Sequence, residues 1–472
     1  MPEHCDVIVV GARCAGSPLA ALLAERGVSV TVLERASFPR ETLSSHLFEA
    51  DGLAFLARLG LLERLRATGA PLIAHTDTRV EDLELRMPLP QRPGDVGAVI
   101  SIRRGPLDQI LAERAAQAGA QVRMGARVTG LLRERGRVAG VRVLEDGAER
   151  ELRARLVVGA DGRNSTVARL AGARAYNLTP SQRLLFWAYY EGVREGPQPT
   201  FLSHRFGERF ILGVPTDGGL YQVLVWPEHH ERARFQADRD GAFLEHARAC
   251  EPLAEMLAGA TQVGRAIGAF SWTGFFREAC GPGWVLCGDA GHFKSPGPGR
   301  GIGDAFMQAE RLADAIAPAL GGPEAQLDGA LRDWGRWRER EFAEHYWLAY
   351  DLEEPGAAPA VLVELLRRLD AQGRAGLFFE LLYHRIRPAQ LLTPPRLAGA
   401  TARLLARGPG AAPAGAGGGP ASRGALLAEI ARLGARDLRR RLQNRHPVYA
   451  AEEQPDERAA PAEEQQLEQA LP

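Results

Sequence analysis

The sequence predicts an α/β protein in three parts: a discontinuous parallel-sheet domain (1–174 and 281–345), a sheet-containing second domain (175–280) and a helical C-terminal region (346–446). Three observations predict this division. Short buried strands alternate with helical patterns near the N-terminus, aromatic residues gather in the middle of the chain, and helical periodicity dominates the last third. With 472 residues, the chain is long enough for two or three hydrophobic cores.

The N-terminus opens with a strand, a glycine-bearing turn, a helix and a second strand. Cys5–Val10 is a short apolar strand, and Ser17–Arg26 is rich in Ala and Leu and ends at Gly27. A second strand, Val28–Leu33, runs directly into Glu34. This order predicts a βαβ unit of the Rossmann type.

The turn between the first strand and helix reads Gly11-Ala12-Arg13-Cys14-Ala15-Gly16. Backbone N–H groups and the helix dipole at such a helix start suit a pyrophosphate, and Glu34 can accept hydrogen bonds from ribose hydroxyls. Arg13 occupies a position where glycine would let the pyrophosphate approach the backbone closely. The Arg13 side chain must therefore point away from the phosphates or form an ion pair with them. The motif does not separate FAD from NAD, and a structural turn without a ligand is the alternative.

The following segments continue the alternation of strands and helices. In chain order we expect a helix at 107–119, a hairpin from Val122 to Val143 turning at Arg135-Gly136, a strand at Arg155–Gly159, strands at Leu184–Tyr190 and Tyr221–Trp226, and a buried strand at Trp284–Cys287.

A long helix follows and ends at Gly321-Gly322-Pro323. The apolar face of this helix is formed by Ile302, Ala305, Phe306, Ala309, Leu312, Ala313 and Ile316. Residues 324–405 are also mostly helical. The Gly/Ala/Pro-rich segment 408–423 predicts a flexible linker, and a basic amphipathic helix follows at Ala425–Gln443. The polar, glutamate-rich segment 447–472 is predicted to be a disordered tail.

Composition excludes several classes of protein. Basic and acidic residues balance at 58 each, which argues against a nucleic-acid footprint or an anionic-membrane surface. No apolar run reaches the roughly 18 residues of a membrane span, and the N-terminus lacks a signal-peptide pattern, so we expect a cytoplasmic protein. The five cysteines form no CxxC pair, which argues against a disulfide framework or a zinc site, and no metal is expected.

Three later segments carry a family resemblance. Val158-Gly159-Ala160-Asp161-Gly162-Arg163-Asn164-Ser165 resembles the "DG" motif, and Cys287-Gly288-Asp289-Ala290-Gly291-His292 the "GD" motif, of the para-hydroxybenzoate hydroxylase superfamily of flavoproteins. Pro296-Gly297-Pro298-Gly299-Arg300-Gly301-Ile302-Gly303 resembles the loop along the flavin ring. The order and spacing match over about the first 350 residues, and the resemblance implies an FAD-dependent oxidoreductase.

The resemblance assigns cofactor roles by position. Asp289 is expected to hydrogen-bond ribityl hydroxyls, Arg104 to contact the cofactor, and Arg40 to lie beside the flavin or pyrophosphate, although each arginine is otherwise explained as a surface charge. N–H groups at Ile302 and Gly303 would face flavin N1 and O2 and favour the reduced anion. The full set of expected cofactor-binding residues is Gly11, Arg13, Gly16, Glu34, Arg35, Arg40, Arg104, Val128, Asp161, Gly162, Asp289, Pro296, Gly299, Gly301, Ile302 and Gly303.

The hydroxylase branch of this superfamily implies a monooxygenase reaction. NADPH or NADH reduces the flavin, which captures O2 as a C4a-hydroperoxide and oxidises an electron-rich carbon. The aromatic-rich second domain favours a bulky aromatic or polyketide-like substrate, although plain core packing explains at least half of these rings. The candidate wall residues are Phe186, Trp187, Tyr189, Tyr190, Phe201, Phe210, Tyr221 and Trp226.

His46 and Lys294 are the candidate catalytic residues, and His292 is a structural neighbour of Asp289. Lys294 is the only lysine in the chain, against 57 arginines, so it marks either a position that needs a compact ammonium or a chance survival. A proton-handling role for His46 competes with ordinary packing.

Several functions stay open. The Gly11–Gly16 form and the segment Phe38–His46 resemble a branch that mixes monooxygenases with geranylgeranyl reductases and relatives of halogenases. A reductase of carbon–carbon double bonds is therefore the main alternative. A halogenase ranks lower, because residues 35–100 hold no lysine and the family's Trp-x-Trp-x-Ile-Pro motif is absent. A non-catalytic flavin-binding protein ranks last. The substrate, NADPH versus NADH, and the oligomeric state are not determined.

Overall fold

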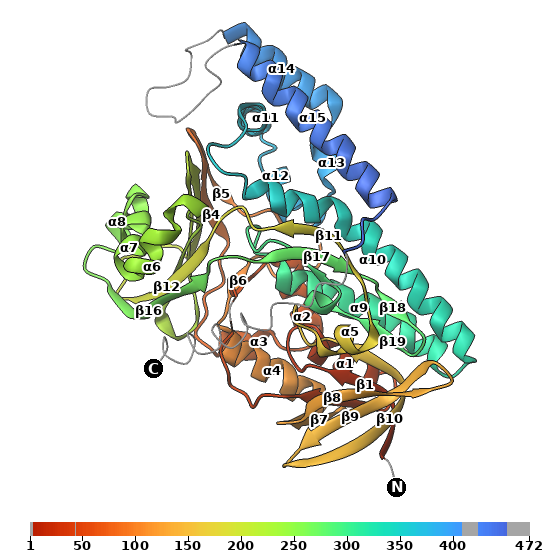
Figure 1. Cartoon of the computed structure of the whole chain (residues 1–472). Coiled ribbons are helices and arrows are strands. Elements are labelled where there is room, and N and C mark those ends of the chain that lie inside the picture. The colour runs from red at the N-terminus through yellow and green to blue at the C-terminus, as the bar shows by residue number, and fades with distance from the viewer. Residues whose placement is uncertain (1–2, 43, 408–422, 451–472) are drawn as a thin grey trace.

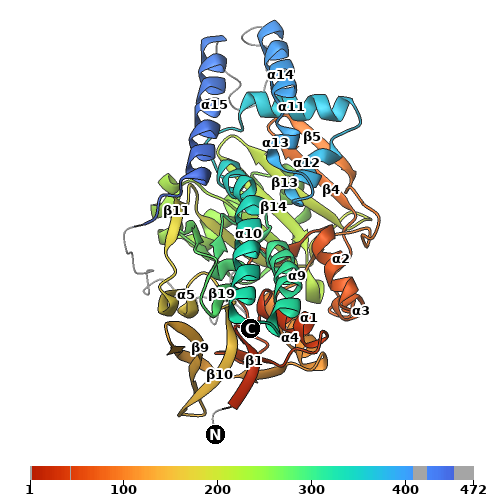
Figure 2. The ribbon, with the colours of Figure 1, turned by 90° about the vertical axis from the view of Figure 1, so that its right-hand side faces the viewer.

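The structure is a computed structural model that describes residues 3–42, 44–407 and 423–450. The expected linker lies outside these residues except for Arg423, as does the expected tail except for residues 447–450. Figure 1 shows the N-terminal sheet at one end of the molecule and the helices α14 and α15 at the opposite end. The view turned by 90° agrees (Figure 2).

An eight-stranded sheet forms the N-terminal part of the molecule, in the order β18-β19-β10-β1-β2-β7, with β9 paired to β10 and β8 to β9. Its strands are β1 (Glu3–Val10), β2 (Val30–Glu34), β7 (Gln121–Met124), β8 (Arg127–Glu134), β9 (Arg137–Glu145), β10 (Ala148–Gly159), β18 (Cys280–Gly281) and β19 (Trp284–Leu286). β1 runs parallel to β2 and β10, and β10 runs parallel to β19. Segments far apart in sequence therefore end at one edge, which confirms the predicted Rossmann-type α/β fold.

Helices cover this sheet and bury its apolar side chains. They are α1 (Gly16–Ala24), α2 (Ala50–Arg58), α3 (Leu62–Arg66), α4 (Arg104–Gln117), α5 (Thr166–Ala171), α9 (Gly301–Leu320) and α10 (Glu324–Leu352). α1 packs against both α4 and α9. The predicted apolar face of the long helix is confirmed, because all seven of its residues are buried in α9. The predicted hairpin turn is also confirmed: Arg135 and Gly136 both have positive φ between β8 and β9.

A second sheet of seven strands has the order β16-β12-β15-β14-β13-β4-β5. Its strands are β4 (His75–Val80), β5 (Leu83–Pro88), β12 (Leu185–Glu191), β13 (Thr200–Phe206), β14 (Arg209–Pro215), β15 (Tyr221–Val225) and β16 (Thr261–Ala269). β4 and β5 come from the first 174 residues, and β4 pairs in parallel with β13. The division of the chain into domains stays a prediction. In the structure, β4 and β5 belong to the sheet of the second predicted domain, although their residues lie within the range predicted for the first.

Three short helices pack on one face of the second sheet: α6 (Arg232–Ala237), α7 (Arg239–Arg248) and α8 (Glu251–Met256). Figure 1 places them at the left of the sheet. Successive residues of β12 point to opposite faces. Phe186 and Tyr190 pack into the core with Phe235 and Phe243 of these helices, while Trp187 belongs to the core on the other face.

Smaller elements join the two sheets. They are β3 (Leu47–Phe48), β6 (Ile100–Ser101), β11 (Ala175–Pro180), β17 (Thr273–Arg277), β20 (His292–Phe293) and the 3₁₀ turns η1 (Asp217–Gly219), η2 (His229–Glu231) and η3 (Gly288–Ala290). β11, β17 and β20 form a three-stranded sheet. Tyr449 bridges to Tyr176 of β11, so the first residues of the expected tail are paired with the body of the protein.

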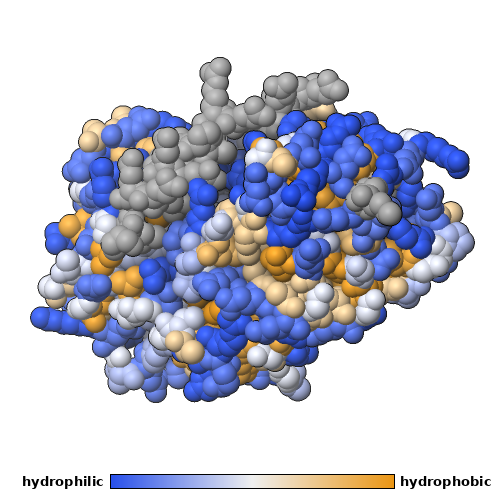
Figure 3. All heavy atoms as spheres, turned by 90° about the horizontal axis from the view of Figure 1, so that it is seen from below, coloured by the Kyte–Doolittle hydropathy of each residue, from blue (hydrophilic) through white to orange (hydrophobic). Residues whose placement is uncertain are grey.

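The C-terminal region consists of helices, as predicted. They are α11 (Ala360–Ala371), α12 (Gly376–Leu382), α13 (Pro388–Leu391), α14 (Pro394–Arg407) and α15 (Arg423–Arg445). Within the described ranges, none of the helices combines the length and apolarity that a bilayer crossing needs. Seen from below, polar residues cover much of the surface, and apolar residues gather near the middle of that face (Figure 3).

Arg183 ties the second sheet to the end of α10. Its guanidinium is fully buried and donates hydrogen bonds to the backbone oxygens of Trp226 (3.1 Å), Glu353 (3.2 Å) and Glu354 (3.1 Å). A planar fork of donors can reach several carbonyl groups at once, whereas an ammonium cannot match this geometry. The residue therefore fixes the C-terminal helices against the sheet.

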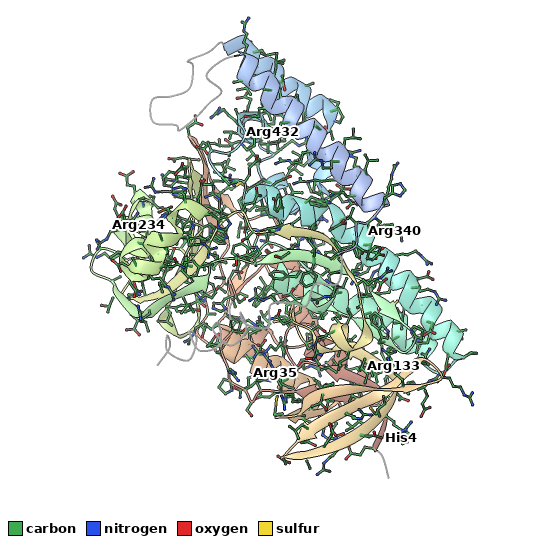
Figure 4. The ribbon with its side chains drawn as sticks, in the orientation of Figure 1. His4, Arg35, Arg133, Arg234, Arg340 and Arg432 are labelled. Carbon is green, nitrogen blue, oxygen red and sulfur yellow. The ribbon has the colours of Figure 1, made fainter. Side chains whose placement is uncertain are left out.

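We expect Arg183→Lys to destabilise the protein by about 2–4 kcal/mol, because it leaves buried carbonyl groups without donors. The measurement is the free energy of unfolding in urea. Arg340→Lys is the control, since Arg340 is exposed on α10 with its side chain pointing outward (Figure 4), and it should change stability by less than about 0.5 kcal/mol. Equal stability of the two variants would contradict the role of Arg183.

Candidate functional site

A cavity of about 600 Å³ lies where the carboxyl ends of the parallel strands face the second sheet. Val10, Glu34 and Ala160 line it from β1, β2 and the end of β10, while Leu185 and Trp187 line it from β12. In open α/β sheets, ligands bind at the carboxyl edge of the strands. The cavity is therefore in the position expected for a dinucleotide, and its lining extends to the second sheet.

The turn before α1 has no space for side chains at two glycines. Gly11 has φ +100°, and a Cβ there would lie 2.5 Å from the Ala160 oxygen. A Cβ on Gly16 would lie 1.8 Å from the Gly11 oxygen. Gly11 lines the cavity, whereas Gly16 lies behind it and makes the tight turn possible. No side chain caps the start of α1 and its first turn holds no acid, so its N–H groups suit an anion.

Glu34 stabilises the same turn. Its carboxylate is buried, accepts hydrogen bonds from the backbone N–H groups of Ala12 (2.9 Å) and Ala36 (3.0 Å), and still lines the cavity. A carboxylate has about four acceptor positions. Glu34 can thus hold the turn and also accept from a ribose, as its sequence position predicts.

Two arginines at the turn share one buried carboxylate. Arg104 donates to Asp108 at 3.0 Å and 3.1 Å, and Arg13 donates to the same group at 3.0 Å. Burial lowers the pKa of Arg104, but the nearby Asp108 carboxylate outweighs this effect, and the pKa of Arg104 lies above its usual value. The single buried carboxylate of Asp108 does not neutralise both guanidinium groups, so they remain able to pair with a pyrophosphate. Asp108 was not among the predicted site residues, although its spacing four residues after Arg104 is a helical ion-pair signal.

The two aspartates of the DG and GD motifs both line the cavity. Asp161 accepts hydrogen bonds from the Ser165 hydroxyl (2.5 Å) and the Val167 N–H (3.1 Å), which organise the start of α5. Burial raises the pKa of Asp289 to about 6, and Arg104 opposes this effect. Asp289 therefore faces the cavity as a partly desolvated acceptor, as expected of a group that binds hydroxyls.

The glycine-rich loop before α9 forms another wall. Pro296, Gly299, Gly301 and Ile302 line the cavity. Gly303 does not, because it faces the guanidinium of Arg300: a Cβ at Gly303 would lie 2.7 Å from Arg300 Nη1. No side-chain hydrogen bond caps the start of α9. The helix thus presents free N–H groups to the cavity, consistent with the predicted position of the flavin ring.

The two candidate catalytic residues differ in position. Lys294 lines the cavity. His46 does not; it is buried with φ 60° and hydrogen-bonded through Nε2 to the hydroxyl of Tyr189. Burial lowers the pKa of His46 well below its usual value, so the imidazole is neutral. A direct proton transfer by His46 therefore has no geometric support, although its predicted role is otherwise untested.

Of the eight candidate wall residues, Trp187 lines the cavity and the other seven do not. Trp272 and Phe293, which were not predicted, join Trp187 there. The remaining expected cofactor residues that line the cavity are Arg35, Arg40, Val128 and Gly162. The site thus combines a polar, cationic end at the α1 turn with an aromatic end at β12.

The donor set fits FAD. The α1 turn offers uncapped N–H groups and two arginines to a pyrophosphate, Glu34 and Asp289 offer carboxylates to hydroxyls, and the loop before α9 leaves room for a flat ring. The cofactor roles of individual residues stay predictions.

Comparison with known proteins agrees with this chemistry. The model of the FAD binding domain family matches residues 4–330. A digeranylgeranylglycerophospholipid reductase of Methanosarcina acetivorans is 29% identical over 359 residues, covering 72% of this chain and 82% of the relative.

Solved structures share the fold. A myxobacterial chondrochloren halogenase aligns with a TM-score of 0.66 and 23% identity, covering 84% of this chain and 96% of the halogenase. Aklavinone-11 hydroxylase, solved in a ternary complex with FAD and aklavinone, aligns with a TM-score of 0.58 and 21% identity, covering 75% of this chain and 70% of the hydroxylase.

Substitution of Gly16 tests the turn. In Gly16→Ala the new methyl group overlaps the Gly11 oxygen, so the turn must shift and the affinity for FAD should fall by roughly tenfold or more. Quenching of flavin fluorescence on titration with the apoprotein measures the Kd. Gly321→Ala is the matched control, because nothing lies within 4 Å of its added Cβ and its φ is ordinary. An unchanged Kd for Gly16→Ala would exclude this turn as the phosphate site.

Glu353, at the end of α10, is fully buried beside Gly297 of the glycine-rich loop. Burial raises the pKa of its carboxyl from 4.5 to about 7, and Ser295 and Arg183 oppose this effect. Between these two values the folded protein binds the proton more strongly than the unfolded chain does. Stability is therefore lost as pH rises through this window, and the loss is complete above pH 7.

Glu353→Gln should remove this pH dependence. Below pH 4.5 the variant and the wild type should be about equally stable, whereas at pH 8 the variant should be more stable by up to roughly 3 kcal/mol. Thermal unfolding midpoints of both proteins between about pH 4 and pH 8 provide the measurement. If the difference in unfolding midpoint between Glu353→Gln and the wild type does not increase with pH, the carboxyl of Glu353 is not desolvated.

Proposed function

Because the chain belongs to the FAD binding domain family and is an FAD-dependent oxidoreductase, we propose that it is a monooxygenase. In this proposal it hydroxylates a bulky aromatic or polyketide-like small molecule, with NADPH or NADH as the electron donor. The observation that carries the proposal is the single cavity that joins the expected cofactor residues to Trp187, Trp272 and Leu185. Such a cavity lets an aromatic substrate lie beside a bound flavin.

FAD, when bound, supplies the redox chemistry and the activation of oxygen. The chain supplies binding, orientation and exclusion of water. Trp187 and Trp272 can stack on or border an aromatic ring and keep its reacting face dry. The uncapped N-terminus of α9 favours negative charge at the edge of the cavity, and Lys294 offers a hydrogen-bond donor there.

The fold of aklavinone-11 hydroxylase supports the choice of substrate class, since that enzyme was solved with FAD and aklavinone. The halogenase among the neighbours supports the fold but not halogenation, because residues 35–100 hold no lysine and the tryptophan motif expected of halogenases is absent from the sequence.

A reductase of carbon–carbon double bonds is the second candidate. The 29% identity to a digeranylgeranylglycerophospholipid reductase favours it. The apolar part of the cavity wall would also accept a prenyl chain. The two functions differ in their use of oxygen: a monooxygenase consumes O2 and inserts one of its atoms, whereas a reductase adds two hydrogens without oxygen.

The test uses the FAD-loaded protein with NADPH or NADH, ¹⁸O2 and a panel of aromatic polyketides and prenyl compounds. We expect oxygen uptake stimulated by an aromatic compound and a product that carries one ¹⁸O atom. A product heavier by two hydrogens, formed equally without air, would contradict the monooxygenase and support the reductase.

Two neighbouring residues of β12 provide a matched pair for the substrate wall. With an aromatic substrate, Trp187→Leu should raise KM by about tenfold, equivalent to roughly 1.4 kcal/mol of lost contact. Phe186→Leu should leave KM within about threefold, because Phe186 packs on the opposite face of the sheet under α6–α8. Similar effects on KM would exclude β12 as the substrate wall.

A further inference from the structure

Lys294 is held from two sides at the cavity wall. The residue is buried, lines the cavity, and donates from Nζ to Oδ2 of Asp304. Nζ also lies 3.1 Å from Nε2 of His384. His384 comes from the loop after α12, so the C-terminal region reaches the cavity wall through this side chain. Asp304 and His384 together fix the position of one ammonium group.

The geometry defines the protonation of this trio. An ammonium can only donate, so the contact between Lys294 Nζ and His384 Nε2 leaves the ring proton on Nδ1, which lies 2.9 Å from Oδ1 of Asp304 without hydrogen-bond alignment. Nε2 then has a lone pair and accepts from Lys294. Burial lowers the pKa of His384 well below its usual value, which agrees with a neutral ring. Burial lowers the pKa of Lys294, but Asp304 opposes this effect, so Lys294 is the cation of the trio and Asp304 is the anion.

The carboxylate of Asp304 has little left to offer a ligand. Besides Lys294 and His384, it accepts a hydrogen bond from Nε of Arg300 at 3.2 Å. The charge of Asp304 is thus shared between two buried cations. Arg300 has further partners in Glu49 (3.0 Å) and Asp51 (2.6 Å) on its other side. Lys294, in contrast, has Asp304 as its only carboxylate among the described residues.

An ammonium group has three N–H donors, and Asp304 and His384 use two. Across the described residues, no third acceptor is recorded for Nζ. The neighbouring imidazoles add no competing charge, because burial lowers the pKa of His292 and of His345, the latter to about 4. Lys294, a residue of the cavity lining, therefore keeps one N–H donor for which the described residues supply no acceptor.

We propose that Lys294 binds a negatively charged oxygen of the substrate, supplied by an ionised phenol, enol or carboxyl group, and that Asp304 and His384 position its ammonium. This inference rests on the proposed function and narrows its substrate class to acidic aromatic molecules. Lys294 contacts the substrate, whereas His384 acts through Lys294 as a positioning residue.

The experiment measures binding alone, on the FAD-loaded protein without an electron donor. The probes are 2-naphthoate and 2-naphthamide, which have similar shape and differ in charge. Changes in flavin absorbance on titration give each Kd. The wild type should bind the acid about tenfold tighter than the amide, a difference of roughly 1.4 kcal/mol. Lys294→Met should bind both probes with similar Kd values.

His384 provides the positioning test. His384→Gln keeps an acceptor for Lys294 and should retain most of the preference for the acid, whereas His384→Leu should lose most of it. Arg127→Gln removes another cation from the cavity lining and should leave the preference unchanged, so it controls for the general field of the cavity. Retained flavin content shows that each variant is folded.

Equal Kd values for the two probes in the wild type, failure of both probes to bind, or an unchanged preference in Lys294→Met would overturn the inference. So would an equal loss in Arg127→Gln. These results are distinguishable from failure of the proposed function. Hydroxylation without a preference for acids would refute only the role of Lys294, while the preference without hydroxylation would refute only the monooxygenase.

Discussion

The close crossing of backbone at Gly11, Gly16 and Ala160 is the constraint on which the site depends. The distances at these positions leave no room for a Cβ on either glycine. They bring the ends of β1 and β10 and the beginning of α1 into one fixed arrangement. Glu34 adds the end of β2 through its hydrogen bond to the Ala12 N–H. Because this contact is made by backbone and one buried carboxylate, the residue at position 13 is free to be an arginine.

The opposite half of the site depends on buried charge. Lys294, Arg300 and Asp304 lie under the glycine-rich loop, and Arg183 and Glu353 lie behind it. Burying such groups is costly unless each has partners, so they stabilise one arrangement of the loop more than they stabilise the fold as a whole. His384 extends this network into the C-terminal helices. The region after α10 is therefore part of the architecture of the cavity.

Local patterns predicted the fold where they were strong. The βαβ unit at the N-terminus and the apolar face of α9 have clear periodicity, and both were predicted. β4 and β5 were not, because β4 is short and polar and joins β13 by a parallel pairing across more than a hundred residues. Alternation along β12 shows that Phe186 and Trp187 face opposite sides, but only the position of α6–α8 determines which side meets the cavity.

The candidate site followed the same rule. Motif spacing placed Gly11, Asp161, Asp289 and Gly299 at one cavity, because each follows a strand or precedes a helix of the parallel sheet. Gly303 was expected at the flavin ring, yet its small size accommodates Arg300. His384 has no sequence signal, since it is 90 residues from Lys294 in a loop without a motif. Long-range packing decides such contacts.

A crystal structure of the protein with FAD bound tests the central claim most directly. The account predicts one FAD whose pyrophosphate lies at the α1 turn and whose isoalloxazine ring lies along residues 296–302, facing Trp187. A flavin bound elsewhere, or one whose ring points away from the second sheet, would contradict it.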